Sequence, residues 1–153
     1  MATNYLARPL ANGEAIPYHL LLLADPSKEM IDAYLDDNNV FVYEVGGEVV
    51  GVYVLWQDGA YIEIKNIAVH EAMQARGIGS LLINDAIARA RDLGFPQIHI
   101  GTGNSSLRQL GLYQRLGFDM QLIKKHFFTT HYPGTIIEDG IQCKHLILLS
   151  KEL

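Results

Sequence analysis

The sequence predicts an α/β fold in which a mixed, mostly antiparallel sheet of six to seven strands is flanked by about four helices. Two patterns lead to this prediction. Residues 39–69 form short β-branched and aromatic runs separated by glycine turns, which is typical of antiparallel strands. From residue 78 the apolar spacing changes to the helical period, and helices then alternate with strands. A meander followed by a strand–helix–strand crossover requires a mixed sheet with helices on its faces.

Length and composition fit one globular domain that spans residues 1–153. Of the 153 residues, 49% are hydrophobic, which is enough apolar material for one core. The formal charge is −5 and the basic residues form no cluster, so nucleic acid is not an expected partner. The single cysteine, Cys143, excludes an internal disulfide and fits a reducing compartment, with the cytoplasm as the default. No apolar run approaches the length of a membrane span, so no membrane association is expected.

The N-terminal part of the chain predicts one short strand and two short helices. Residues 5–10 include a residue that precedes proline, a position that favours extended geometry, so we expect a strand there. An apolar helix should follow over residues 18–24. Asp25-Pro26 then predicts the start of a second helix, with Asp25 as its N-cap and the proline in its first turn. Apolar residues at helical spacing give this helix a face that should cover the sheet.

The middle of the chain predicts the strand meander and a longer helix. Strands are expected at residues 39–45, 48–56 and 60–69, joined by glycine-containing hairpin turns. The apolar spacing of residues 78–93 predicts an amphipathic helix, which Gly94 can end in a left-handed conformation.

A strand, a helix and a strand are expected next. Residues 97–101 predict a buried strand, and either Asn104 or Ser105 can cap a helix that ends near Arg115. Residues 118–123 then predict a strand.

The C-terminal segment predicts one final strand after an irregular stretch. Residues 124–140 are rich in aromatic and histidine side chains and have no clear period. Residues 141–149 predict the last strand, on which Cys143 and His145 share a face with apolar neighbours. We therefore interpret these two side chains as sheet packing, and we expect no metal site.

The segment Gln74-Ala75-Arg76-Gly77-Ile78-Gly79-Ser80, between a strand and a helix, carries the strongest functional signal. Glycines let the backbone approach a ligand, and a helix N-terminus adds free N–H groups and partial positive charge, which together suit a pyrophosphate. Arg76 can add a charge-assisted contact. No Gly-Lys-Ser/Thr follows, which excludes a P-loop, and the third glycine of a dinucleotide-binding fingerprint is missing. A tight turn without a ligand is the alternative.

The pattern Gln74-x-x-Gly77-x-Gly79 resembles the acetyl-CoA signature of the GNAT acetyltransferases. Two other segments support the resemblance, which covers roughly residues 39–123. Residues 67–69 are similar to the family's splayed fourth strand, and residues 112–118 to its later helix-to-strand signature. The resemblance implies the GNAT fold, acetyl-CoA as the acetyl donor and transfer of the acetyl group to an amine.

The resemblance also implies which residues bind the cofactor. Main-chain groups of the splayed strand would pair with the pantetheine arm, and N–H groups of the glycine corner would hold the pyrophosphate. In this chain these residues are Ile67, Ala68, Val69, Gln74, Ala75, Arg76, Gly77, Ile78, Gly79 and Ser80. The family often has asparagine seven residues before its conserved tyrosine, whereas this chain has Ser106 there and Asn104 two positions earlier. Either residue can contact CoA, and helix capping would also explain Asn104.

Two residues are candidates for proton transfer. The resemblance places a base at Glu63, because an amine with a pKa near 10 must lose a proton before it attacks a thioester. Glu63 can instead be a solvated cross-strand partner of a lysine. Tyr113 matches the tyrosine that protonates the departing thiolate in the family, and it is also a cofactor contact. A core tyrosine with its hydroxyl bound to the backbone is the alternative.

The acceptor is the part of the function that the sequence leaves open. Side chains of the early helices and of the irregular segment can border its pocket: Tyr18, His19, Tyr34, His126, His131 and Tyr132. The acidic balance favours a cationic small molecule, such as an aminoglycoside or a polyamine, over a protein lysine or N-terminus. A non-catalytic acetyl-CoA-binding module and a nicotinamide or flavin nucleotide protein are the rival functions. Similar proteins often dimerise through their final strands, so a homodimer is also expected.

Overall fold

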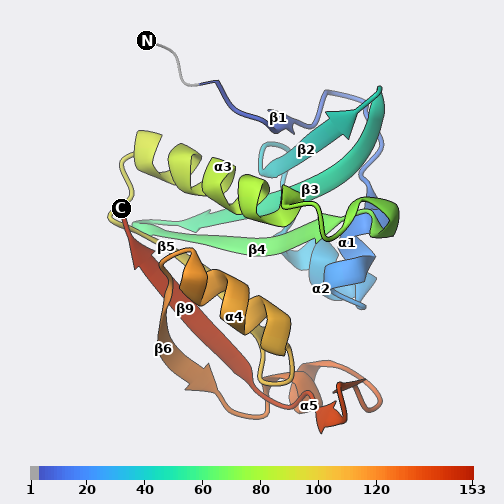
Figure 1. The fold of residues 1–153 in the computed structure, drawn as a ribbon, viewed down its shortest axis with the longest axis vertical. Coiled ribbons are helices and arrows are strands. Elements are labelled where there is room, and N and C mark those ends of the chain that lie inside the picture. Colours follow the sequence, from blue (N-terminus) through green and yellow to red (C-terminus); the bar gives the residue numbers. More distant parts are fainter. Residues whose placement is uncertain (1–3) are drawn as a thin grey trace.

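The computed structural model describes residues 4–153 and confirms the predicted mixed sheet (Figure 1). Seven strands lie in the order β1-β2-β3-β4-β5-β9-β6, and among them only β4 and β5 are parallel neighbours. The sheet strands are β1 (Arg8–Pro9), β2 (Val40–Val45), β3 (Glu48–Asp58), β4 (Tyr61–Val69), β5 (Gln97–Gly103), β6 (Asp119–Lys124) and β9 (Leu146–Glu152). The helices are α1 (Tyr18–Ala24), α2 (Lys28–Tyr34), α3 (Ile78–Asp92), α4 (Leu107–Arg115) and α5 (Phe127–His131), with a 3₁₀ turn, η1 (Glu71–Met73).

The core is divided between the two faces of the sheet. On one face, α3 and α4 pack against the sheet through buried side chains such as Leu82 and Leu110. On the other face, α1 and α2 cover the half of the sheet made by β2, β3 and β4, with Leu20, Leu21 and Ile31 fully buried. The period-two and helical patterns of the sequence therefore predict these faces correctly, because each element buries the stripe that its own period lines up.

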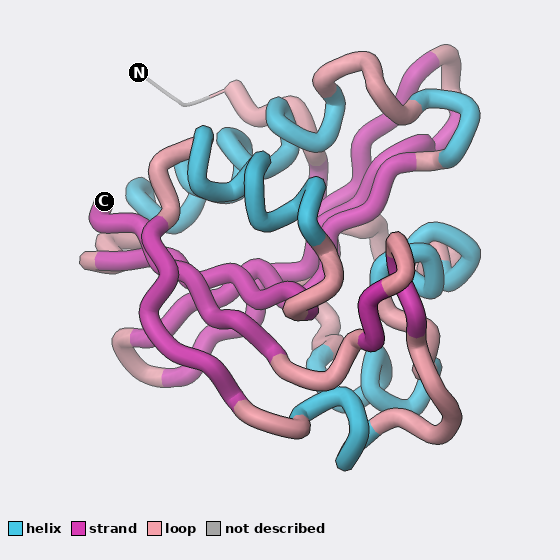
Figure 2. Tube along the Cα trace, turned by 60° about the horizontal axis from the view of Figure 1, so that its bottom comes forward, coloured by secondary structure: helices cyan, strands magenta, loops and turns pink. Residues whose placement is uncertain are grey.

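Strands β4 and β5 separate soon after they meet. They pair only at Glu63↔His99 and Ile64↔Ile100, and β4 then continues to Val69 with no strand on that edge. A β-bulge at Lys65, the residue skipped in the register with β3, coincides with the point of separation. Bulges bend and twist a strand, so the bulge turns the end of β4 away from β5. Figures 1 and 2 show the sheet opening into two halves.

The start of the second helix differs from the prediction. Asp25 is not its N-cap: it ends α1 in an extended conformation, and Ser27 caps α2 by accepting a hydrogen bond from the Met30 N–H. The Asp25 carboxylate instead accepts from the Ser27 N–H and from two tyrosine hydroxyls, and these contacts hold it outside the helix. The first strand is also shorter than expected, since only Arg8–Pro9 pairs with β2.

The C-terminal segment contains more structure than its sequence predicts. Residues 124–140, expected to be irregular, include α5 and the first strand of a small hairpin formed by β7 (Ile137–Glu138) and β8 (Ile141–Gln142). The hairpin and α5 form the near end of the molecule in Figure 2.

The predicted last strand is wrong over its first half. It is divided into β8 and β9, and Cys143 and His145 lie in the loop between them, off the sheet. The buried Cys143 packs beside Gly103, where an added Cβ would lie 2.5 Å from its sulfur. The alternation of residues 141–149 suggested one strand, but the chain leaves the sheet to make these loop contacts.

Candidate active site

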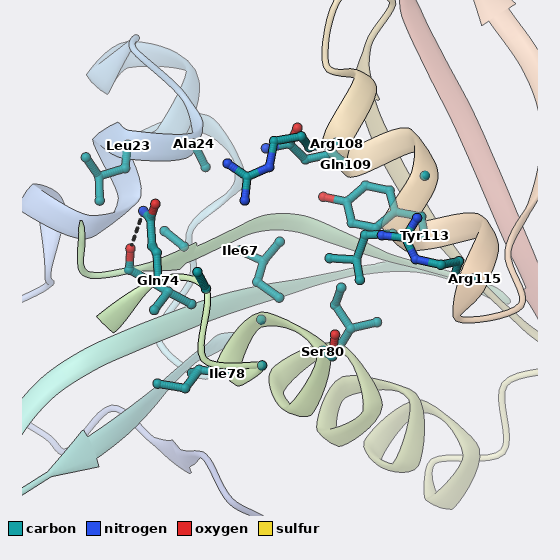
Figure 3. Close-up of a pocket in the computed structure, with 18 of the residues that line it drawn as sticks. Leu23, Ala24, Ile67, Gln74, Ile78, Ser80, Arg108, Gln109, Tyr113 and Arg115 are labelled. Carbon is teal, nitrogen blue, oxygen red and sulfur yellow. Dashed lines mark hydrogen bonds between the residues drawn. The ribbon is translucent and has the colours of Figure 1, made fainter. Parts of the chain in front are cut away.

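A cavity of about 550 Å³ opens where β4 and β5 separate. Figure 3 shows its walls: the end of β4 and the start of α3 on one side, α4 on the other, and α1 across from Tyr113. Its lining includes every cofactor residue predicted in the glycine corner except Arg76, and all three predicted on β4. The cavity therefore brings together residues of α1, β4, α3 and α4, which come from three separate stretches of the sequence.

The open edge of β4 presents main-chain groups to this cavity. The His70 N–H donates to the Val50 carbonyl on β3, so the preceding residue directs its main-chain groups to the opposite edge of the strand. By the same alternation, Ile67 and Val69 face the side that β5 has left. The Val69 carbonyl accepts from the Gln74 side chain at 2.9 Å, which ties the strand to the glycine corner. The resulting edge can accept an extended chain as an added strand.

The glycine corner ends at the N-terminus of α3. Gly77 is the N-cap with φ of 80°, and Ala75 also has a positive φ of 62°. Gly77 has no side chain to accept from the first-turn N–H groups, which are not used inside the helix. These N–H groups and the helix dipole make a site for phosphate oxygens. The pyrophosphate interpretation is thus consistent with the local geometry.

The arginines that line the cavity come from α4 and not from the expected position. Arg76 is exposed and does not line the cavity, whereas Arg108 and Arg115 do (Figure 3). The sequence analysis missed both. The two arginines are seven residues apart, a spacing that places both on one face of a helix, and this signal was available in the sequence.

Tyr113 projects into the cavity with a free hydroxyl. The side chain is only 5% exposed and packs beside Phe118 in the core. Its hydroxyl has no hydrogen-bond partner among residues 4–153, so the expected alternative of a hydroxyl bound to the backbone is not found there. Burial raises the pKa of Tyr113 above its ordinary value, and the phenol stays protonated at neutral pH. It can therefore donate a proton to a group in the cavity.

Glu63 lies in the first of the two β4–β5 pairs, one residue before the last pair, and it does not line the cavity. The side chain is 6% exposed. Its carboxylate accepts from the Tyr61 hydroxyl and lies 3.4 Å from the Lys65 ammonium nitrogen. The lysine partner expected under the non-catalytic interpretation is present, although it comes from the same strand and the carboxylate is buried.

His99 adds a titratable group beside Glu63 that the sequence analysis did not single out. It is the register partner of Glu63 on β5, and its ring stacks on Tyr61 with 4.3 Å between the ring centroids. Burial lowers the pKa of His99, and the nearby Glu63 charge opposes that effect. The buried His99 Nδ1 has no hydrogen-bond partner in the described part of the chain. Only the parallel pairing of β4 with β5 brings this histidine to Glu63.

Asn104 and Ser106 contact other parts of the chain. The Asn104 side chain accepts from the N–H groups of Lys144 and His145 and donates to the Gln142 carbonyl, so it holds the loop before β9. The N-cap of α4 is Ser106 and not Asn104 or Ser105 as predicted. The hydroxyl of Ser106 donates to Glu138 at 3.0 Å.

Of the six residues predicted to border the pocket of the acceptor substrate, two contact the same aspartate and the other four do not. The hydroxyls of Tyr34 and Tyr132 both donate to Asp25, at 3.1 and 2.8 Å. Tyr18 donates to Asp32 on the exposed side of α2. His19, His126 and His131 are exposed, and the His126 N–H donates to the His145 ring.

Residues 4–153 contain neither a membrane-spanning helix nor a metal-ligand cluster. None of their helices has the length and apolar character to cross a bilayer. Nor do three or more His, Cys, Asp or Glu side chains in this range gather as a metal site would require.

Comparison with known proteins identifies what the chain is similar to. The model of the acetyltransferase (GNAT) family matches residues 10–118. An uncharacterized N-acetyltransferase of Bacillus subtilis (strain 168), YvbK, is 48% identical over 137 residues, which cover 89% of this chain and 88% of that protein. The crystal structure of a GNAT family acetyltransferase from Elizabethkingia anophelis with acetyl-CoA bound has a TM-score of 0.94 and 47% identity, and covers 99% of this chain and 100% of that one. The structure of a B. subtilis acetyltransferase in complex with CoA has a TM-score of 0.89 and 44% identity, with 98% and 99% coverage.

Proposed function

This chain belongs to the GNAT family and is an acetyl-CoA-dependent N-acetyltransferase, and from that premise we propose how it acts and on what class of acceptor. We propose direct transfer of the acetyl group to a primary amine, within one acetyltransferase domain formed by the whole chain. The observation that carries the proposal is the cavity at the separation of β4 and β5, with the protonated Tyr113 hydroxyl inside it and Glu63 in the first of the two β4–β5 pairs beside that separation.

The cofactor-binding residues follow from the shape of this cavity. The first-turn N–H groups of α3 hold the pyrophosphate, and the free edge of β4 at Ile67 and Val69 pairs with the pantetheine arm. A Val69 N–H then lies where it can polarise the thioester carbonyl. Arg108 and Arg115 add positive charge on the α4 side.

Chemical transfer requires one proton to leave the amine and one to reach sulfur. The amine nitrogen attacks the thioester carbonyl carbon, a C–N bond forms, and the C–S bond breaks. Glu63, directly or through a water, takes the proton that the amine loses, and the Tyr113 phenol gives its proton to the departing thiolate. The phenolate is reprotonated from solvent and Glu63 releases its proton, so the enzyme returns to its starting state.

A cationic small molecule is the acceptor class that we favour over a protein lysine or N-terminus. The net charge of −5 supports a cationic acceptor. A module that binds acetyl-CoA without transferring the acetyl group is the second candidate, but it leaves the Tyr113 hydroxyl in the cavity without a role.

A thiol-release assay tests the proposed function. The purified chain is incubated with acetyl-CoA and aminoglycosides, polyamines, amino acids or peptides, and free CoA is measured, with calorimetry for binding of acetyl-CoA. We expect binding together with amine-dependent release of CoA. Binding without release above background for any amine would instead identify a sensing module, and absence of binding would refute the cofactor site.

A further inference from the structure

Asp25 joins three segments that are far apart in the sequence. It ends α1, accepts a hydrogen bond from Tyr34 at the end of α2, and accepts another from Tyr132, which follows α5. The hydroxyl of Tyr34 also accepts from the side chain of Asn66 on β4 at 3.0 Å. This half-buried network thus connects α1 and α2, the segment that follows α5, and strand β4 beside the cavity.

The charge of Asp25 is not compensated by a cation in residues 4–153. Of the other carboxylates that accept from a tyrosine in this range, three have a cation within 4 Å. Asp32 lies 2.9 Å from Lys28, Glu63 lies 3.4 Å from Lys65, and Asp85 lies 3.8 Å from Arg89. Asp25 has two neutral phenols and one N–H as donors and no ion pair in that range. A partly buried carboxylate with only neutral donors favours a cation from outside the chain.

The position of Asp25 points to the acceptor as the source of that cation. Asp25 lies just outside the cavity lining, and the two residues before it, Leu23 and Ala24, line the cavity across from Tyr113 (Figure 3). Asn66 precedes Ile67, which also lines the cavity. The Oδ1 atom of Asn66, whose residue is 4% exposed, is buried without a hydrogen-bond partner among the described residues. Both the uncompensated carboxylate and this unused acceptor favour a donor-rich, positively charged neighbour.

The cation at Asp25 cannot be the amine that attacks. Attack needs a neutral nitrogen, and a carboxylate beside that nitrogen would keep it protonated. Along β4, the three residues from Glu63 to Asn66 span about 10 Å, so the Asp25 network lies well away from Glu63. One acceptor can meet both requirements if it carries two amines separated by a chain.

We propose that Asp25 holds the second, charged amine of a diamine acceptor while the first amine attacks acetyl-CoA. The inference rests on the proposed function, because it assigns a substrate class to the same site. The substrate class is aliphatic diamines and polyamines, and Asp25 is a specificity-determining residue that makes no contact with the reacting atoms.

Matched amines and matched variants test the proposal. Cadaverine and n-pentylamine have the same carbon chain but differ in the second amine, and we compare kcat/KM for the two in the thiol-release assay. The wild-type enzyme should prefer cadaverine. Asp25→Asn keeps the shape of the side chain and removes its charge, so it should raise the KM for cadaverine about tenfold or more and leave the KM for acetyl-CoA and the kcat for cadaverine nearly unchanged.

Two further variants separate charge from structure. Asp32→Asn removes the same charge from a carboxylate that also binds a phenol but already has Lys28 as its cation, and it should leave the cadaverine preference intact. Asp25→Glu keeps the charge and should retain a preference for cadaverine. Thermal unfolding of each variant shows whether it remains folded.

Each outcome decides the proposal. An equal loss for cadaverine and pentylamine in Asp25→Asn, or no loss for cadaverine, would overturn it. Absence of transfer to any diamine by the wild-type enzyme would also overturn it, and the monoamines, aminoglycosides and peptides of the same panel then show whether the proposed function itself fails. Transfer to those amines alone leaves the proposed function standing.

Discussion

Tyr113 differs from the other buried tyrosines of this chain in the state of its hydroxyl. The hydroxyls of Tyr53 and Tyr132 each donate to an aspartate, whereas that of Tyr113 has no partner in residues 4–153 and lies against the cavity. The hydroxyl oxygen is not among the fully buried polar atoms that lack a partner, so it is accessible from the cavity. This position is consistent with a group whose partner is the substrate.

We expect Tyr113→Phe to lower turnover by about 10²-fold or more while acetyl-CoA still binds, because the variant keeps the ring packing and loses only the proton donor. Single-turnover rates and calorimetry measure the two effects separately. Unchanged turnover would remove the proposed acid role.

Glu63→Gln tests the proposed base through the pH dependence of the rate defect, which a purely structural role of Glu63 would not produce. Glutamine keeps the size of the side chain, so the variant should slow transfer strongly at pH 7, where an amine with a pKa near 10 is mostly protonated. The defect should shrink as pH rises, because the neutral fraction of the amine grows about tenfold per pH unit below that pKa. Rates from pH 7 to 9 measure this. A defect that is constant with pH, accompanied by lower thermal stability, would indicate that Glu63 only stabilises β4 through Tyr61 and Lys65.

Individual site residues were predictable to different degrees. Tyr113 and the glycine corner lie in local patterns of a few neighbouring residues, so the sequence located them. Asp25 was interpreted as a helix cap, because its local context, an Asp-Pro pair, is typical of one. Its actual partner Tyr132 is 107 residues away, a separation that no local pattern reports.

At the scale of elements, the N-terminus of α3 is the phosphate site that we propose. Gly79 is the second residue of that helix, and an added Cβ would meet no atom within 4 Å in the protein itself. The glycine is therefore not required by packing. Close approach of a ligand to the backbone is the physical reason that remains.

The variant Gly79→Ala should separate binding from stability. Alanine favours helix over glycine, so the free energy of unfolding should stay unchanged or rise by up to about 1 kcal/mol. The new methyl group should nevertheless weaken acetyl-CoA binding about tenfold or more, because it occupies the approach to the first-turn N–H groups.

Chemical denaturation and calorimetry measure both quantities. Leu81→Ala, which changes a 47% exposed side chain in the same turn, is the control and should bind acetyl-CoA normally. Normal binding by Gly79→Ala would show that the phosphates do not approach this turn.

The separation of β4 and β5 is also an element-scale feature, and the sequence indicated it only through family resemblance. The bulge at Lys65 has no residue signature in this strand, because β-branched and aromatic residues continue on both sides of it. Pairing geometry with β3 decides where the bulge falls, and that geometry depends on the neighbouring strand.

On the scale of the whole molecule, one buried network attaches the N-terminal segment to the sheet and to α3. The carboxylate of Asp85, 7% exposed, accepts from the N–H groups of Leu6 and Ala7 and from the Tyr53 hydroxyl at 2.7 Å, and it lies 3.8 Å from Arg89. Removal of this carboxylate leaves its N–H and hydroxyl donors without their acceptor and the largely buried Arg89 cation without its counter-charge.

Asp85→Ala should lower the free energy of unfolding by about 3 kcal/mol, as measured by chemical denaturation. Asp119→Ala, a change of the same kind on the exposed edge strand β6, should alter it by no more than about 0.5 kcal/mol. A loss below about 1 kcal/mol for Asp85→Ala would mean that the N-terminal segment contributes little to the stability of the fold.

The sequence by itself determined the type and order of most elements, the glycine corner before α3 and the position of Tyr113. Periodicity, turn residues and short motifs act over a few residues, and local physics is enough to specify them. The tertiary structure decided which distant groups meet: Asp25 with Tyr132, Glu63 with His99, and α5 with its hairpin outside the sheet. These contacts depend on the path of the whole chain around two sheet faces, and no segment of the sequence specifies that path alone.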